Sequence, residues 1–395
     1  MGNIINRTIS ESILNAYSYF PVIAITGARQ VGKTTLCKHL FPQFRYVNLE
    51  DLSMREIIAD DMKKFVNGVQ EGIIIDEIHH LPELFSFIQV VVDNNRDKRF
   101  ILTGSSNLAM MQHLSQSLAG RVAVFTLPPL SVFEIQEQIQ SFSTNELLFK
   151  GLYPAGYSLQ IPPELLYSNY YNTYIERDVR QLINVKNLTL FQKFIRLCAG
   201  RAGSECNMSA LSNEVGVSVP TINEWLSILE ASYIIFKLPP FYDNIGKRLI
   251  KTPKYYFYDT GILCFLLGIE NSKQLETHPL RGGIFENLIV AEFFKARFNK
   301  GKQPNCYFYR DSKGTEVDLL QLFGNEINMF EIKSSQTFNA KYFDSINKVS
   351  AIFGDRVKCT SVVYDGEDTR QNEQAGIYNW RELFSEGSKK LSEGK

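Results

Sequence analysis

The chain has 395 residues, of which 44% are hydrophobic and 21% are charged, which is the composition of an ordinary globular protein. Its length predicts two or three domains rather than one. Lys plus Arg and Asp plus Glu both number 42, so no overall charge directs the chain to nucleic acid or to a membrane. The six cysteines form no C-x-x-C pair, and the sequence shows neither a signal peptide nor an apolar run of membrane-spanning length. We therefore expect reduced thiols, a cytoplasmic location and no membrane partner.

A short helix over residues 7–19 and a strand over residues 22–25 are predicted to precede a phosphate-binding loop. Residues 27–34, Gly-Ala-Arg-Gln-Val-Gly-Lys-Thr, fit G-x-x-x-x-G-K-[ST], and the helix that follows is stopped by Pro42. In this strand–loop–helix context backbone N–H groups face a polyphosphate, Lys33 pairs with the β- and γ-phosphates, and the Thr34 hydroxyl binds Mg²⁺. The sequence therefore predicts a site for ATP and Mg²⁺ made by consecutive residues: Gly27, Ala28, Arg29, Gln30, Val31, Gly32, Lys33, Thr34 and Thr35.

A strand over residues 45–49 and a helix over residues 53–66 lead to an apolar strand that ends in two acids. Residues 73–75 are all isoleucine, as in a buried parallel strand, and Asp76 and Glu77 follow directly. After a phosphate-binding loop, Asp76 is expected in the Mg²⁺ shell and Glu77 as the general base for the attacking water. Without such a loop, the pattern would indicate only a buried strand with a solvated acidic end.

Two further strands are predicted at residues 100–104 and 122–125, the first preceded by a helix that begins near Pro82. Ser105 and Ser106 follow the first of these strands; either one senses the γ-phosphate, or the two form a simple turn. Arg121 directly precedes the last strand, where it is either an arginine finger, acting in a neighbouring subunit, or an ordinary surface arginine. Strands that alternate with helices predict a parallel sheet covered on both faces.

Four stretches carry a family resemblance: residues 27–35, 73–82, 100–107 and 117–121. They resemble the ATPase core of AAA+-like (or STAND-like) ATP-binding proteins of bacteria and archaea that have a C-terminal domain of unknown function. The resemblance implies ATP hydrolysis and a sheet in which the sensor strand lies between the two Walker strands. Residues 151–154, Gly-Leu-Tyr-Pro, resemble a diverged Gly/Pro hinge motif of STAND-type relatives, and residues 174–180 resemble the charged motif that opens the family's C-terminal region.

The middle of the chain follows the order of a winged-helix fold: a helical stripe over 191–198, helices over 209–215 and 219–229, and a strand over 233–238. The helix in the recognition position has no basic residue and contains Glu224, so it is poorly suited to reading bases. A basic wing is better suited to phosphate contact. Its residues are Lys247, Arg248, Lys251 and Lys254. The alternative is a winged helix that serves as a lid or a protein contact.

The last part of the chain resembles a restriction-endonuclease-like core. A helix over 284–298 contains Glu286, a hairpin contains Asp318, and the next strand contains Glu331-x-Lys333, as in the PD-(D/E)XK motif. Because side chains alternate along a strand, Glu331 and Lys333 project from one face. Asp318, Glu331 and the auxiliary Glu286 would then hold Mg²⁺, and Lys333 would act on the attacking water or the phosphate. A chance D…E-x-K pattern in an ordinary sheet is the alternative.

The predicted fold class is α/β: an AAA+-like P-loop NTPase sheet, a winged-helix domain and a restriction-endonuclease-like α/β domain. The predicted boundaries are 1–135 for the ATPase core, 136–185 for a connector, 186–260 for the winged helix, 261–385 for the nuclease-like domain and 386–395 for a polar tail. We expect an ATPase that acts on nucleic acid, DNA rather than RNA, in an ATP-gated way, either as a single chain or as a homo-oligomer. The main alternative is an ATP-dependent switch whose nuclease-like domain is inactive and binds DNA or a protein.

Overall fold

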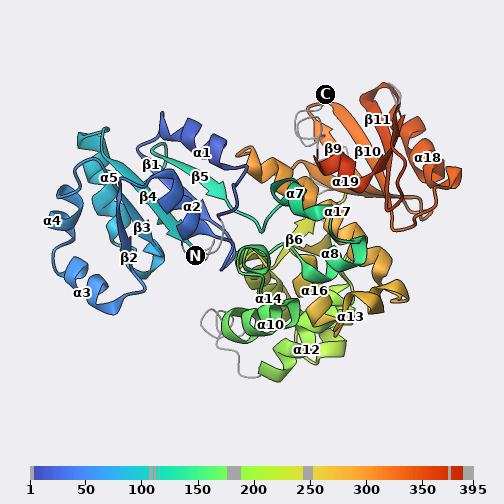
Figure 1. The fold of residues 1–395 in the computed structure, drawn as a ribbon, viewed down its shortest axis with the longest axis horizontal. Coiled ribbons are helices and arrows are strands. Elements are labelled where there is room, and N and C mark those ends of the chain that lie inside the picture. The colour runs from blue at the N-terminus through green and yellow to red at the C-terminus, as the bar shows by residue number, and fades with distance from the viewer. Residues whose placement is uncertain are drawn as a thin grey trace.

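The computed structural model of the chain describes residues 4–105, 110, 113–114, 116–175, 188–242, 252–371 and 375–385. Figure 1 shows two sheets toward opposite ends of the molecule, with a group of helices below and between them. Some predicted features lie outside the described residues: Ser106, most of the charged motif over 174–180, the basic residues Lys247, Arg248 and Lys251, and the polar tail. None of the described helices is long and apolar enough to cross a membrane.

The N-terminal sheet has five parallel strands in the order β2-β3-β4-β1-β5. The strand β4 lies between β1 and β3, which confirms the expected position of the sensor strand between the two Walker strands. The strand bounds are β1 Val22–Thr26, β2 Arg45–Asn48, β3 Gly72–Asp76, β4 Arg99–Gly104 and β5 Val122–Thr126.

Helices cover both faces of this sheet, as the alternation of its apolar side chains requires. Ile23 and Ile25 of β1 belong to one buried cluster, whereas Val22 and Ala24 belong to another. The helix expected over 53–66 is two helices, because Asp61 leaves helical geometry and its side chain caps the second one by accepting from Lys64 N. The helix bounds are α1 Ser10–Tyr17, α2 Lys33–Leu40, α3 Leu52–Asp60, α4 Met62–Asn67, the 3₁₀ turn η1 Ile78–His80 and α5 Leu84–Asn94.

The middle of the chain is mainly helical and ends in an antiparallel strand pair, β6 Ile235–Leu238 and β7 Lys254–Phe257. The helices and the strand expected near 191–238 are present, with Gly216 in left-handed conformation between α13 and α14. The bounds are η2 Phe133–Ile135, α7 Gln136–Ile139, α8 Thr144–Lys150, α9 Ala155–Ser158, α10 Pro163–Tyr170, the π-helical turn η3 Tyr171–Ile175, α12 Leu188–Ala199, α13 Met208–Val215, α14 Val219–Ala231, α16 Thr260–Leu266 and η4 Ser272–Glu276.

The C-terminal sheet is mixed, with six strands in the order β12-β13-β11-β10-β9-β8. Buried side chains of α17 pack on one face of the sheet, and those of α18 pack on the other. The bounds are α17 Arg281–Asn299, β8 Cys306–Arg310, β9 Glu316–Phe323, β10 Glu326–Lys333, η5 Ala340–Phe343, α18 Asp344–Phe353, η6 Gly354–Arg356, β11 Val357–Tyr364, β12 Arg370–Gln371, β13 Ala375–Asn379 and α19 Trp380–Ser385.

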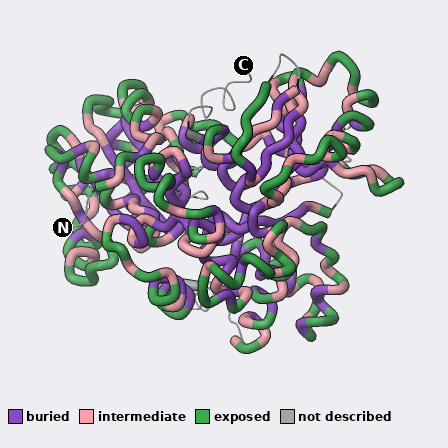
Figure 2. Tube along the Cα trace, turned by 45° about the vertical axis from the view of Figure 1, so that its right-hand side comes forward, coloured by how far each residue is buried: buried purple, intermediate pink, exposed green. Residues whose placement is uncertain are grey.

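One buried cluster joins all three parts of the chain. It extends from Ile9 near the N-terminus, through the middle helices, to Phe293 of α17 and Phe384 of α19. Figure 2 shows buried segments through the middle of the molecule. Because this core is continuous, the sheet of the N-terminal part and helix α17 are held against the same connecting segments.

Candidate functional site

The loop between β1 and α2 has a backbone that few residues can adopt. Gly27 has a φ of 147°, and a Cβ atom there would lie 2.2 Å from the Leu127 carbonyl oxygen. Gly32 has a φ of 94° and precedes α2, and Gln30, although not a glycine, has a φ of 60°. Such conformations turn successive backbone N–H groups toward a common centre, which is the arrangement that binds phosphate. The two glycines of the motif are thus explained by close approach and by positive φ.

Lys33 is buried and points back into this loop. Its Nζ donates to the carbonyl oxygens of Gly27 and Ala28 at 2.9 and 2.8 Å. Burial lowers the pKa of the Lys33 ammonium, although the nearby Glu77 and Asp76 carboxylates oppose that shift. The positive charge is therefore held at the centre of the loop by weak neutral acceptors, which a phosphate oxygen can replace.

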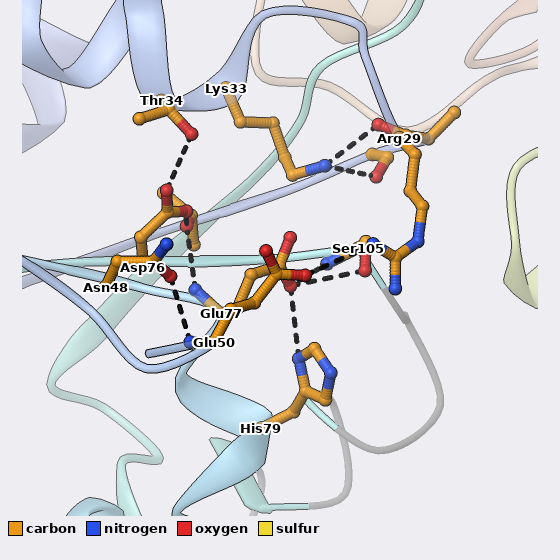
Figure 3. A network of polar contacts seen from close by, with 12 residues as sticks. Arg29, Lys33, Thr34, Asn48, Glu50, Asp76, Glu77, His79 and Ser105 are labelled. Carbon is orange, nitrogen blue, oxygen red and sulfur yellow. Dashed lines mark hydrogen bonds and ion pairs between the residues drawn. The ribbon is translucent and has the colours of Figure 1, made fainter. Parts of the chain in front are cut away.

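Asp76, at the end of β3, accepts hydrogen bonds from three hydroxyl groups. Thr34 Oγ1 and Tyr46 OH donate to its Oδ2 at 2.7 and 2.8 Å, and Thr103 Oγ1 donates to its Oδ1. Figure 3 shows Thr34, in the first turn of α2, facing Asp76 at the end of β3. A hydroxyl and a carboxylate side by side are the hard oxygen ligands that Mg²⁺ prefers, so this pair fits the predicted magnesium ligands.

Glu77 has a φ of 53°, an uncommon left-handed conformation for a side-chain-bearing residue. Its Oε2 accepts from Ser105 N at 2.9 Å and from Ser105 Oγ at 3.2 Å, and lies 3.2 Å from His79 Nδ1. These residues converge in Figure 3. Although burial raises the pKa of Glu77, the hydrogen bond from His79 and the charge of Lys33 outweigh it and lower that pKa to about 2. The carboxylate is therefore ionised and fixed in one orientation.

Arg29 and Arg121, the two arginines predicted to act in the ATPase site, lie in different surroundings. Arg29 of the loop is paired with Glu50 at 3.3 Å. Arg121 precedes β5, which pairs in parallel with β1, so it lies at the start of these strands, whereas the phosphate-binding loop follows the end of β1. Its guanidinium makes two bonds to Asp93, Nε to Oδ1 at 2.5 Å and NH2 to Oδ2 at 2.8 Å. Within one chain Arg121 therefore cannot reach the loop, and a role as an arginine finger requires a second copy.

The four residues of the nuclease-like motif come together from three elements. Glu286 lies on α17, Asp318 on β9, and Glu331 and Lys333 on β10. Lys333 Nζ lies 2.7 Å from Glu331 Oε1 and 3.8 Å from Asp318 Oδ2. Asp318 Oδ2 also accepts from Ile332 N at 2.8 Å, which locks β9 against β10 at this point. With Glu316, these carboxylates form a cluster that we call the acidic centre.

Lys254 also belongs to the acidic centre, which corrects its predicted role as a phosphate contact on an exposed wing. The residue is only 3% exposed, and its Nζ lies 2.5 Å from Glu316 and 3.6 Å from Glu286. Two residues along β7, Tyr256 OH donates to the same Glu286 oxygen at 2.6 Å. The prediction was wrong for Lys254 because β7 packs on α17, where Asn287 binds both the N–H and the carbonyl of Phe257.

The acidic centre does not form a ready metal site. Among the described residues, no three His, Cys, Asp or Glu side chains are arranged to hold a metal ion. Burial and the charge of Asp318 raise the pKa values of both Glu286 and Glu331 to about 7. Lys254 and Lys333 supply the positive charge that the predicted metal would supply, so the expected ligands Glu286, Asp318 and Glu331 share one centre but bind lysines.

Several residues that the sequence did not point to complete these sites. Asp76 accepts hydrogen bonds from Thr103 and Tyr46, and Glu77 lies beside His79. In the acidic centre, Glu286 accepts a hydrogen bond from Tyr256, and Lys254 pairs with Glu316. A polar residue inside an apolar strand is the one signal that could have revealed Thr103, which lies in Phe-Ile-Leu-Thr-Gly. The sequence gives no comparable signal for Tyr46, His79, Tyr256 or Glu316.

Family comparisons divide the chain into three matched parts. Residues 19–136 match the AAA domain, residues 141–273 match a domain of unknown function (DUF8612), and residues 281–382 match another domain of unknown function (DUF4143). The first match contains the phosphate-binding loop, Asp76 and Glu77.

Several relatives extend over most of the chain, and two of them come from a bacterium and an archaeon. An uncharacterized protein of Mycobacterium tuberculosis is 28% identical over 369 residues, which cover 91% of this chain and 80% of that protein. An uncharacterized protein of Methanocaldococcus jannaschii is 22% identical over 397 residues, covering 85% and 81%. Among solved structures, the chain is similar to a Walker-type ATPase of Pyrococcus abyssi, with 14% identity, a TM-score of 0.47, and coverage of 67% of this chain and 96% of that one.

Proposed function

Because residues 19–136 form an AAA-type P-loop ATPase domain, we propose that the chain uses ATP hydrolysis to control a nucleic-acid-processing centre in its C-terminal domain. One observation carries the second half of the proposal. Glu286 of α17, Asp318 of β9 and the pair Glu331 and Lys333 of β10 come from three separate segments and meet at one place. Titratable groups with perturbed pKa values that meet in one cluster are a typical feature of functional sites.

In the ATPase site, each side chain has a separate task. The loop N–H groups and Lys33 would hold the β- and γ-phosphates, and Thr34 and Asp76 would hold a Mg²⁺ ion, whose charge would offset that of the phosphates. Ser105 and His79 fix Glu77, which orients the attacking water. A carboxylate with a pKa of about 2 is a weak base. Glu77 would therefore act mainly by accepting a hydrogen bond from the attacking water and orienting it.

The proposal is tested with purified protein on linear, circular and single-stranded DNA and on RNA, with Mg²⁺ or Mn²⁺ and with or without ATP. Lys33→Ala should lose ATP binding, and Glu77→Gln should bind ATP but hydrolyse it about 10²–10³ times more slowly. Asp318→Ala and Lys333→Ala should abolish cleavage and leave ATP hydrolysis intact. Lys358→Ala is the matched control, since Lys358 lies on the neighbouring strand β11 in an exposed pair with Glu326. Absence of cleavage by the wild-type protein in every nucleotide state would overturn the nuclease part.

A second candidate is an ATP-dependent switch in which the C-terminal domain only binds DNA or a protein. The internal pairing of Lys254 and Lys333 with the acidic centre favours it, because the charges there are already satisfied. Binding of nucleic acid without cleavage, unaffected by Asp318→Ala, would support the switch. Loss of both binding and cleavage would leave a protein partner as the remaining target.

A further inference from the structure

Arg7 is a buried arginine that hydrogen-bonds to a backbone carbonyl of the phosphate-binding loop. It is only 8% exposed. Its NH1 donates to the Val31 carbonyl and its NH2 to the Pro128 carbonyl, both at 2.7 Å. One guanidinium thus joins the loop after β1 to the segment after β5. None of the roles assigned above to the loop residues uses this contact.

The contact with Val31 determines how the loop faces its ligand. In a planar trans peptide the C=O and the following N–H point in opposite directions. Since the Val31 carbonyl points to Arg7, the Gly32 N–H points away from Arg7, where it is free to face a phosphate bound in the loop. Arg7 therefore orients one of the N–H groups that bind phosphate, without itself touching the nucleotide.

Glu134 holds Arg7 in place and also fixes the connecting segment, residues 128–135. Its Oε1 lies 3.2 Å from Arg7 Nε and accepts from Thr8 N at 2.7 Å, and its Oε2 accepts from Ser131 N at 2.9 Å. The side chain of Glu134 is 1% exposed. A buried ion pair with this many hydrogen bonds behaves as one rigid unit, because breaking any part leaves a buried charge uncompensated.

Side chains of helix α17 also form hydrogen bonds to the backbone of this connecting segment. Glu292 Oε2 accepts from Val132 N at 2.8 Å, and Lys295 Nζ donates to the Leu130 carbonyl and to Glu292 Oε1, both at 2.9 Å. The Glu292 and Lys295 side chains are almost fully buried. Glu286 of the acidic centre lies six residues earlier on α17, about 9 Å along a helix axis. The helix is thus held at both the ATPase domain and the acidic centre.

We propose that Arg7 is a positioning residue of the phosphate-binding loop and that the Arg7–Glu134 pair transmits the position of the loop to helix α17. The first half rests on the ATPase domain alone. The second half rests on the proposed function, because it supplies the physical route by which ATP would control the acidic centre. A change in the loop moves the Val31 carbonyl, Arg7 follows it, and the connecting segment carries the displacement to Glu292 and Lys295.

The first test is the affinity for ATP. In Arg7→Met, the dissociation constant for ATP should rise at least tenfold while the turnover number at saturation falls much less, since the residue orients a phosphate ligand rather than the water. Arg7→Lys should recover only part of the affinity, because an ammonium lacks the planar fork that reaches two carbonyls. Arg196→Met, at an exposed arginine of α12, is the control. Wild-type ATP affinity in Arg7→Met would overturn the positioning role.

The second test is hydrogen exchange of α17 in the Glu77→Gln protein, with and without saturating ATP. Exchange at residues 286–295 should change on ATP binding, and this change should disappear in Arg7→Met and shrink in Glu134→Gln. A persistent change in Arg7→Met at saturation would overturn the transmission. If α17 never responds to ATP, the transmission and the ATP gating of the proposed function are both wrong, whereas the affinity result still decides the positioning role. Should Arg7→Met fail to fold, Arg7→Lys and Glu134→Gln decide both questions.

Discussion

The hydroxyl of Tyr233 donates to Thr26 Oγ1 at 2.6 Å, joining residues that are 207 positions apart. Thr26 is the last residue of β1, immediately before Gly27 of the phosphate-binding loop. Tyr233 lies between α14 and β6 and has a φ of 57°, which is costly for an aromatic residue. The fold therefore maintains an uncommon backbone conformation at the point where the middle domain touches the base of the nucleotide loop.

Removing this hydrogen bond should weaken the contact between the two domains. Tyr233→Phe should lower the free energy of unfolding by about 1 kcal/mol, the usual net contribution of a buried hydrogen bond. A double-mutant cycle with Thr26→Val isolates the pair, and urea titration measures it. A coupling energy near zero would mean that the hydroxyl groups do not interact in solution.

Thr103 should support catalysis although it does not contact substrate. Thr103→Val leaves the volume unchanged but removes the donor to Asp76 and the acceptor for Glu77 N. We expect ATP turnover to fall about tenfold and the free energy of unfolding to fall by about 1–2 kcal/mol, because buried polar groups lose their partner. Thr103→Ser should restore both quantities. Steady-state kinetics with wild-type values for the Val variant would contradict this role.

Arg121 is predicted to act only between copies of the chain. If it is an arginine finger, ATP turnover per molecule rises with protein concentration, and Arg121→Ala reduces turnover by about 10³ or more without weakening ATP binding. Arg96→Ala, at an exposed arginine near the partner Asp93, serves as the control. Turnover that is independent of concentration would assign Arg121 to its ion pair with Asp93 alone.

Lys254 should be essential for the stability of the acidic centre. Lys254→Met leaves Glu286 and Glu316 without their buried cation, and removing one partner of a buried pair typically costs about 3–5 kcal/mol. Adding Glu316→Gln should recover part of the loss. Lys358→Met, which breaks an exposed pair, should cost about 1 kcal/mol or less. Equal losses for the two lysines, measured by denaturant titration, would show that Lys254 is not buried.

Asp259 gives a prediction for the pH dependence of stability. Burial raises its pKa above the usual value, although Leu152 N at 2.5 Å and Ile262 N at 3.0 Å donate to its oxygens and oppose the shift. A raised pKa in the folded state means that its contribution to stability is complete below about pH 4, the unfolded value, and is lost as the pH rises through the folded value. The advantage of the wild type over Asp259→Asn should therefore shrink as the pH increases from about 4. A difference that is constant with pH, in urea titrations, would contradict this.

The sequence alone predicted the features whose causes are local. A β-branched strand, a loop with two glycines and a helix stopped by proline are neighbours along the chain, so the strand, loop and helix over residues 22–41 were predicted. The alternation of side chains in β10 likewise placed Glu331 and Lys333 together. The order of the parallel strands came from the family resemblance, because spacing along the chain does not specify which strands are neighbours.

Tertiary structure decided which charges meet. Lys254 looked like an exposed wing residue because its neighbours in sequence are basic, yet β7 packs on α17 and buries it between carboxylates from two other elements. Arg7 carries no local pattern, since its partners Val31, Pro128 and Glu134 lie 24 or more residues away. The physical reason is that backbone geometry and side-chain periodicity are set by adjacent residues, whereas the environment of a charge depends on every segment that excludes water from it.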